Sequence, residues 1–231
     1  MTSMKKRNPV RTLLSGLFAA SFLGAAVAML GGGAAVPEAA SGLAPQENAQ
    51  ADEKSMNEWK VDSVHSCALF RIRHMGAGFF WGRFNDVTGS VYFEEKSLST
   101  LRMNISIDVE SVDSGHPDLD RHLKSPDFFD SKEFPKMTFK STSAKSVPTT
   151  KRSDSPLMAG EVTGELTMHG KSKEITAKVL YWGSADKGRG MRAGFEVMFR
   201  VKRSEFGITY GVDQGALGDW VDVTAAFELI K

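Results

Sequence analysis

The fold is decided by the stretch LRMNISIDV, residues 101–109, in which apolar and polar residues alternate without a break. Successive side chains of a β-strand point to opposite faces of the sheet, so this stretch predicts a strand with one apolar and one hydrated face. The period of two recurs elsewhere, clearly at residues 175–181, 195–201 and 221–229, and more weakly at 70–72, 91–93, 137–139 and 162–168. Glycine and proline separate these short runs, which favours an all-β sandwich or barrel of antiparallel strands.

One segment departs from this period. Residues 116–124, HPDLDRHLK, have a proline early, acidic residues before basic ones, and Leu119 and Leu123 four positions apart. This order complements the dipole of a helix and predicts one short helix that begins near His116. We expect residues 125–130 to turn and place their phenylalanines at the mouth of the barrel, and residues 143–159 to form a solvated connection between two strands.

The composition excludes several classes of protein. Hydrophobic residues make up 41% of the chain and charged residues 25%, which is the profile of an ordinary globular protein. The formal net charge of +1 gives no basic excess that would indicate nucleic-acid binding. The single cysteine, Cys67, cannot form an internal disulfide, so the fold must depend on its apolar core.

The N-terminal segment has the pattern of a secretory signal peptide. Basic residues precede an uncharged apolar run, residues 13–29, and Ala26-Val27-Ala28 offers a cleavage pattern of small residues. We therefore predict a signal peptide at residues 1–30, a flexible linker at 31–55 and the barrel domain at 56–231. An uncleaved membrane anchor is the alternative. Residues 1–55 contain five of the 29 Lys and Arg and four of the 28 Asp and Glu, which leaves 24 of each in the domain.

The interior of such a barrel has room either for its own side chains or for one slender ligand. The 15 Phe and 11 Met of the chain could simply fill a core. Residues 78–82, GFFWG, are harder to explain in that way, because three consecutive aromatic side chains cannot all point inward from one strand. We therefore expect at least one of Phe79, Phe80 and Trp81 to lie at the entrance to a cavity.

Catalytic motifs are weak. The five histidines show no spacing typical of a zinc site, and the chain lacks a nucleophile elbow, a phosphate-binding glycine loop and a dinucleotide fingerprint. Asp62 and His65 are three positions apart in a predicted strand, which should place them on opposite faces. We predict no catalytic residue, no metal and no cofactor other than a bound lipid ligand.

Six segments occur in a recognisable order: WKVDSVHS (59–66), GRF (82–84), DSG (113–115) with DRHLKSPDFFD (120–130), FPKMTFKST (134–142), GELTMHG (164–170) and RSEFG (203–207). Together they resemble the YceI-like family, lipocalin-like bacterial proteins associated with polyisoprenoid binding. The resemblance covers residues 59–231. It implies an antiparallel up-and-down eight-stranded barrel with a tubular apolar cavity, which holds a polyisoprenoid or an isoprenoid quinone, and it does not imply catalysis.

The chain departs from this family at one position. The family usually has an arginine immediately before the helix aspartate, where this chain has Leu119. An ion pair made by that arginine would be missing here or supplied by Arg121. This departure leaves the expected fold unchanged and puts a polar role of the helix in question.

We predict from these features an exported protein, periplasmic or secreted, that holds a polyisoprenoid or an isoprenoid quinone for transport or storage. The expected partner is an isoprenoid lipid and not a nucleic acid, and transient membrane contact and a homodimer stay open. The candidate ligand-binding residues, chosen mainly from strand alternation, are Phe70, Ile72, His74, Phe79, Trp81, Phe84, Ile105, Ile107, Phe128, Phe139, Leu166, Phe199 and Phe227.

Two other hypotheses remain. One is a lipid-directed hydrolase or isomerase that uses His65 or His74 as a base, which requires these histidines to cluster with a carboxylate inside the cavity. The other is a structural or interaction protein whose core is filled by its own side chains.

The first testable prediction concerns export. We expect the abundant form of the protein in its native host to begin after Ala28 or after Ala35, because small residues end the apolar run there. N-terminal sequencing checks this, and an abundant form that begins at Met1 or Thr2 would contradict it.

Overall fold

The structure is a computed structural model that describes residues 57–149 and 155–231. The predicted signal peptide, 1–30, and linker, 31–55, lie outside the described residues. The described residues all belong to one compact unit. Within the described ranges, no helix is long and apolar enough to cross a membrane.

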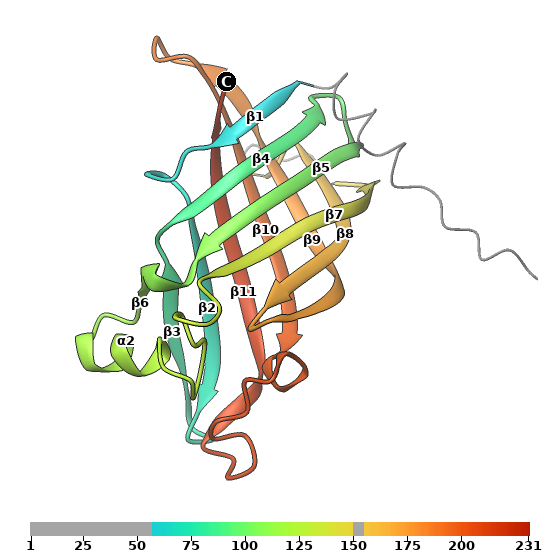
Figure 1. Cartoon of the computed structure of the whole chain (residues 1–231). Helices are drawn as coiled ribbons and strands as arrows, with labels where there is room; N and C mark the ends of the chain where they lie inside the picture. Colours follow the sequence, from blue (N-terminus) through green and yellow to red (C-terminus); the bar gives the residue numbers. More distant parts are fainter. Residues whose placement is uncertain (1–56, 150–154) are drawn as a thin grey trace, which may run out of the picture. The chain divides into compact units, whose positions relative to one another are not determined.

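The described residues form one antiparallel sheet and little helix (Figure 1). A short α-helix and two 3-10 turns interrupt the strands: α2 at Pro117–Leu123, η1 at Val109–Ser111 and η2 at Arg203–Phe206. The strands are β1 (Glu58–Val61), β2 (Cys67–His74), β3 (Gly78–Phe84), β4 (Val87–Glu94), β5 (Ser97–Asp108), β6 (Val112–Asp113), β7 (Lys136–Val147), β8 (Met158–Met168), β9 (Lys171–Asp186), β10 (Met191–Lys202) and β11 (Leu217–Ile230).

Eight of these strands close into a ring. Their order around it is β1-β4-β5-β7-β8-β9-β10-β11, and β11 returns to β1 through the pairs Lys60↔Ile230 and Val61↔Leu229. The first part of β11 pairs instead with β2, which continues through β3 to the short β6. The prediction of an antiparallel eight-stranded barrel with one short helix is therefore confirmed.

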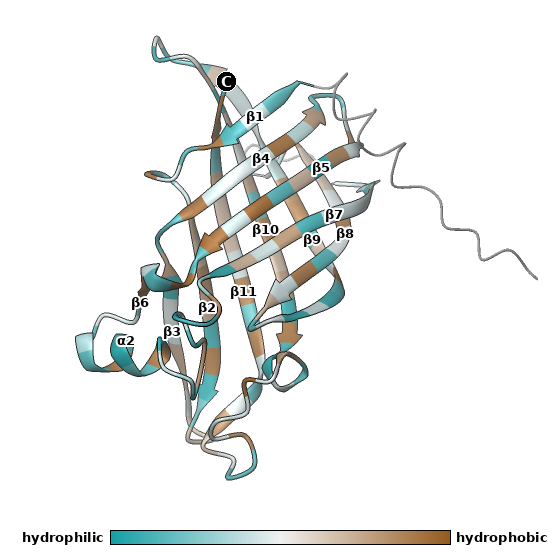
Figure 2. Ribbon diagram, in the orientation of Figure 1, coloured by the Kyte–Doolittle hydropathy of each residue, from teal (hydrophilic) through white to brown (hydrophobic). Residues whose placement is uncertain are grey.

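Strand alternation places one face of each strand inside the barrel. In β5 the buried residues are Leu98, Leu101, Met103 and Ile105, while the polar residues between them are more exposed. Figure 2 shows this alternation as brown and white or teal bands along the strands. The predicted apolar faces of residues 175–181, 195–201 and 221–229 also point inward.

One half of the interior is filled by aromatic side chains. The ring of Phe93 is 1% exposed and has its centroid 5.7 Å from Trp59, 5.3 Å from Tyr181 and 4.9 Å from Phe195. The flanking residues Leu98 and Leu229 are also fully buried. This end of the barrel is therefore closed by its own core, as close packing requires.

The other end carries the non-strand segments. Figure 1 shows α2, the β2–β3 hairpin and the connection between β10 and β11 at this end. The helix begins where the sequence predicted, because the His116 side chain accepts a hydrogen bond from the backbone N–H of Asp118 as the N-cap. Phe128 of the following segment is buried, so this segment does place phenylalanines at the mouth.

Two local predictions were wrong. The first strand ends at Val61, and residues 62–66 turn, so Asp62 and His65 lie side by side rather than on opposite faces. Residues 143–159 are not entirely a solvated connection, since β7 continues to Val147 and β8 begins at Met158. A register shift between Ser141 and Ser143 disturbs the period of two there, which hid the end of β7 from a reading of alternation.

A carboxylate joins β1 to β4. Glu58 Oε1 accepts hydrogen bonds from Lys60 Nζ, from Ser90 Oγ at 2.8 Å and from Tyr92 OH at 2.9 Å. These donors, Lys60 foremost, lower the pKa of Glu58 from its usual 4.5 to about 2. Because the folded pKa lies below the unfolded one, the contribution of this carboxylate to stability is full above pH 4.5 and is lost as the pH falls toward 2.

We therefore predict that Glu58→Gln reduces the stability of the protein near neutral pH and makes no further difference near pH 2. Urea unfolding at a series of pH values measures the gap between the variant and the wild type. The control is Glu165→Gln, which removes an exposed carboxylate from β8. A gap that stays constant between neutral pH and pH 2 would contradict the assignment.

Candidate functional site

A cavity of about 820 Å³ occupies the half of the barrel that the aromatic core leaves empty. Its wall consists mainly of the inward faces of β2, β3, β10 and β11, of α2 with the segment that follows it, and of the β10–β11 connection. Strands β5, β7 and β8 contribute a few further side chains. Almost all of the lining is apolar: Ala68, Phe70, Ile72, Phe80, Phe84, Ile107, Leu119, Leu123, Phe128, Phe129, Met137, Leu166, Met168, Phe199, Val201, Ile208, Leu217, Val221 and Val223.

The wall formed by β2 and β3 depends on a glycine. Phe70 lies opposite Gly82 in the antiparallel register, and both point into the barrel. A Cβ atom at Gly82 would lie 2.5 Å from Cζ of Phe70, which is too close for any side chain. The glycine therefore provides the space in which the Phe70 ring lies flat against the wall.

Three rings from different parts of the chain meet at this wall. The centroid of Phe129 is 5.1 Å from Phe84 and 6.3 Å from Phe70, and Phe70 and Phe84 are 5.6 Å apart. Edge-to-face contacts at such distances are favourable for aromatic rings. They attach the segment after α2 to the barrel.

The helix completes the wall where the sheet does not. Within the part of the chain that the structure describes, β3 pairs with β6 only at Arg83 and Phe84, so Gly78–Gly82 has β2 on one side alone. Leu119 and Leu123 of α2 line the cavity together with the phenylalanines of the next segment. They replace a strand at this point of the barrel.

The position at which the chain departs from the YceI-like pattern thus lies in the cavity wall. Leu119 adds an apolar side chain there. Arg121 forms an ion pair with Asp118 on the exposed side of α2, while Asp120 accepts a hydrogen bond from the backbone N–H of Ser114. Arg121 therefore makes a surface contact and brings no charge to the cavity.

A few polar groups lie at the open end of the cavity. His74, His122, Tyr210 and Arg203 belong to its lining, and no acidic side chain among the described residues does. His122 Nε2 is 2.9 Å from Asp127 Oδ2, and its ring packs edge-on against Phe128 and Tyr210. The mouth can therefore hydrogen-bond a polar group while the interior stays apolar.

Arg203 has a structural role. Its guanidinium, in a residue 4% exposed, donates hydrogen bonds to the carbonyl oxygens of Gly218 at 2.9 Å, Ile208 at 3.2 Å and Tyr210 at 2.7 Å. Burial lowers the pKa of Arg203 below its usual value. These bonds hold the β10–β11 connection in place at the mouth.

Most of the candidate residues line this cavity. They are Phe70, Ile72, His74, Phe79, Phe84, Ile107, Phe128, Leu166 and Phe199. Ile105, Phe139 and Phe227 lie deeper, around a narrow void of about 50 Å³ that shares Ala68, Ile107, Met137, Leu166, Phe199 and Val223 with the cavity wall. Their contact with a ligand stays a prediction.

Trp81 does not line the cavity. It pairs with Arg71 on the outward side of the β2–β3 hairpin and is 54% exposed. Phe80, which the candidate set omitted, points inward instead, and Phe79 lies at the rim. Glycine has no side chain, so the two ends of the GFFWG segment gave no indication of which of its aromatic side chains point into the barrel.

Other lining residues carried no sequence signal of their own. Tyr210, Ile208 and Leu217 belong to or adjoin the β10–β11 connection, where no alternation exists to indicate their direction. Leu119 and Leu123 were recognised as a helical pair, and their spacing alone could have indicated a helix face directed at the barrel.

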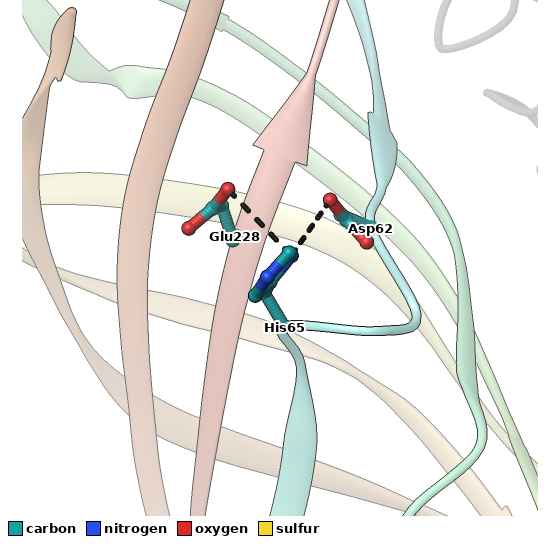
Figure 3. A group of neighbouring side chains, drawn as sticks. All are labelled: Asp62, His65 and Glu228. Carbon is teal, nitrogen blue, oxygen red and sulfur yellow. Dashed lines mark hydrogen bonds and ion pairs between the residues drawn. The ribbon is translucent and has the colours of Figure 1, made fainter.

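A cluster of charged groups lies outside this cavity, next to the β1–β2 turn (Figure 3). His65 Nδ1 is 3.0 Å from Asp62 Oδ2 and 4.0 Å from Glu228 Oε1. Arg192 contacts the same two carboxylates, at 2.9 Å and 3.7 Å. The hydrogen bond from His65, with smaller contributions from Val64 N–H and Arg192, lowers the pKa of Asp62.

These three side chains could each offer one ligand atom to a cation. Arg192 already provides a positive charge to both carboxylates, so we assign the cluster as an ion-pair network that fastens the β1–β2 turn to β10 and β11. His65 lies in the turn before β2 and His74 at the far end of that strand, so the two form no common site.

The comparison with known proteins agrees with this geometry. A family model described as the YceI-like domain matches residues 59–229. The chain belongs to the YceI family. Protein YceI of Salmonella arizonae is 35% identical over 177 residues, which cover 75% of this chain and 87% of that protein.

Solved structures are similar as well. BcnA of Burkholderia cenocepacia has a TM-score of 0.60 at 25% identity, and the match covers 73% of this chain and 98% of BcnA. A polyisoprenoid binding domain from Saccharophagus degradans has a TM-score of 0.56 at 12% identity over 74% of this chain and 97% of that domain, and this likeness concerns the fold. Since BcnA consists almost entirely of the matched domain, we treat residues 44–231 of this YceI-family chain as able to fold alone.

Two glycines of β3 test the cavity wall of this YceI-family barrel. We predict that Gly82→Ala forces the Phe70 ring inward, destabilises the protein by about 1–3 kcal/mol through overpacking and weakens the binding of an apolar fluorescent dye. The control is Gly78→Ala, because a Cβ at Gly78 would meet nothing within 4 Å. Thermal unfolding and dye titration measure both effects, and equal behaviour of the two variants would contradict the described packing.

Proposed function

We propose that this protein is a non-enzymatic carrier or store of an isoprenoid lipid, either a polyisoprenoid or an isoprenoid quinone. The observation that carries the proposal is the apolar cavity of about 820 Å³. This volume lies within the range of about 300–1,000 Å³ typical of small-molecule sites. The polyisoprenoid-binding domain of similar fold supports the choice of ligand class.

The chemistry of the lining favours a hydrocarbon chain over a polar substrate. Burial of each CH₂ group contributes about 0.8 kcal/mol before ordering costs, so a prenyl chain gains affinity along its length. The aromatic and branched side chains around Phe70, Phe129 and Val223 offer continuous apolar contact. The narrow void behind Val223 extends this contact deeper into the barrel.

The head group of such a lipid would lie at the mouth. His74, His122 and Tyr210 are the polar side chains available there for hydrogen bonding. A quinone carbonyl or a hydroxyl could accept or donate one bond at this place without entering the apolar interior. We therefore expect head-group identity to affect affinity less than chain length.

The alternatives receive less support. A filled core leaves no room for a cavity of this size, which argues against a purely structural role. The enzyme hypothesis required His65, His74 and a carboxylate to cluster in the cavity, whereas His65 lies outside it and no described acidic residue lines it. The pair His122–Asp127 at the mouth has no serine, threonine or cysteine beside it among the described residues of the cavity lining.

We further propose that the protein acts outside the cytoplasm, in the periplasm or after secretion. The support is the signal-peptide pattern of residues 1–30. A hydrophobic lipid cannot cross an aqueous compartment unaided, so a carrier there would have a clear use.

The test is a titration of delipidated protein with prenyl compounds of increasing length and one fixed head group. We expect affinity to rise with each isoprene unit until the cavity is full and then to level off. Val223→Phe, in the wall that the cavity and the deeper void share, should level off at a shorter chain. Isothermal calorimetry or competition with a bound dye provides the affinities.

The matched control is Thr224→Phe, the adjacent residue on the outward face of β11, which should leave the series unchanged. A flat series, or no binding by the wild type, would overturn the carrier proposal. Mass spectrometry of organic extracts from the natively produced protein identifies the ligand independently.

A further inference from the structure

Three aromatic side chains are exposed on the outside of the barrel, next to the cavity mouth. Phe79 is 49% exposed, Trp81 54% and Trp220 46%. Trp81 and Trp220 lie on the outward faces of β3 and β11, and Phe79 lies at the rim of the cavity. Their neighbours in sequence, Phe80 and Val221, line the cavity wall. Large aromatic groups in such a position are stabilised when another apolar phase covers them.

Cationic side chains surround these rings. The strand pairs Arg71↔Trp81, Arg73↔Phe79 and Lys202↔Trp220 place a cation beside each aromatic residue. Together with Arg83 and Arg200 these residues lie on four adjacent strands, β10, β11, β2 and β3. We call this set of residues the aromatic–cationic face; its members are Arg71, Arg73, Phe79, Trp81, Arg83, Arg200, Lys202 and Trp220.

Cation–π contacts organise this face. The Arg71 guanidinium lies 4.7 Å from the centroid of Phe79 and 5.6 Å from that of Trp81. Arg200 and Lys202 lie 5.1 Å and 5.2 Å from the ring of Trp220. Each exposed ring therefore contacts at least one positively charged side chain.

The face has an excess of positive charge. Its five cations meet Asp222, which pairs with Arg71 at 3.0 Å and Arg200 at 3.2 Å, and Asp113, which pairs with Arg83 at 3.4 Å. Three positive charges thus remain without a counterpart among these partners. The domain as a whole has equal numbers of basic and acidic residues, so this excess is local.

We propose that the aromatic–cationic face docks the protein on a bilayer that contains anionic phospholipids. Indole and phenyl rings favour the membrane–water interface, and Arg and Lys attract anionic head groups and extend their apolar stems into the interface. The face adjoins the mouth, where Met75 and Tyr210 are also exposed, so docking brings the cavity entrance to the lipid surface.

A second copy of the chain is a poorer partner for this face. A symmetric dimer through it would place like charges opposite one another, which disfavours association. Anionic phospholipids supply both the negative charge that complements the cations of the face and an apolar boundary that can cover its exposed rings. The inference rests on the proposed function for its purpose, which is exchange of the ligand with a membrane, but docking itself needs no ligand.

The experiment is flotation of residues 44–231 with vesicles of phosphatidylcholine alone and of an equal mixture of phosphatidylcholine and phosphatidylglycerol. The shortened chain lacks the apolar N-terminal run, which could bind vesicles by itself. We expect binding to the mixed vesicles and little binding to phosphatidylcholine. High salt should weaken the binding, since exposed charges are screened.

Two variants locate the contact. Arg73→Glu with Lys202→Glu should lower the affinity for mixed vesicles at least about thirtyfold. Trp81→Ser with Trp220→Ser should lower the affinity for mixed vesicles by more than high salt lowers the affinity of the wild type. The matched control is Lys140→Glu with Lys173→Glu, the same change in net charge at exposed positions on β7 and β9, and it should retain most of the binding.

Each contrary outcome has a defined meaning. Equal loss in the control and test variants, or equal binding to both kinds of vesicle, would overturn the proposal. A dimer in sedimentation that Arg73→Glu with Lys202→Glu dissociates, without vesicle binding by the wild type, would assign the face to self-association instead. Prenyl titration of the wild type separates the two proposals, because intact prenyl affinity without docking contradicts only the membrane contact, and docking without prenyl binding contradicts only the carrier function.

Discussion

The whole structure depends on the way β11 divides the hydrogen bonds of one edge between two neighbours, while its other edge pairs with β10. Its C-terminal end pairs with β1 and closes the ring, and its earlier residues pair with β2. The turn at residues 62–66 makes this division feasible, because it separates β1 from β2 and is fastened by the ion pairs of Asp62 and Arg192. A single long strand thus closes the barrel through β1 at one end and pairs with β2, as part of a wider wall, at the other.

The division of β11 has a direct consequence for the interior. Where the ring is closed by β1, the aromatic side chains around Phe93 fill the space. Where β2 and β3 replace β1, the wall is broader, and α2 with its following segment is needed to complete it. The same chain therefore combines a packed core, which stabilises the fold, with a hollow that can accept a ligand without disturbing that core.

Much of this arrangement could be predicted from the sequence, because strand alternation is a local property. The stretch 101–109, the helix at Pro117–Leu123 and most inward residues of β2, β8 and β10 follow from period and capping signals. How deep a residue lies along the barrel does not follow from the local pattern. The sequence therefore did not reveal that Ile105, Phe139 and Phe227 lie deeper than the main cavity. Asp62 and His65 were misplaced because their contact depends on a turn that alternation does not reveal. The role of Arg203 was not predicted, because its partners are backbone carbonyls of a connection without alternation.

The wall that α2 completes is held differently from the rest of the barrel. The ladder hydrogen bonds of the eight-stranded ring do not pass through Leu119, Leu123 or Phe129, which contact the interior only through their side chains. Outward movement of this segment would break local packing and leave the cooperative unit of the ring intact. Amide hydrogens of α2 would then exchange with solvent through a local opening, at a free energy well below that of global unfolding, while those of β5 and β10 would exchange only when the barrel itself unfolds.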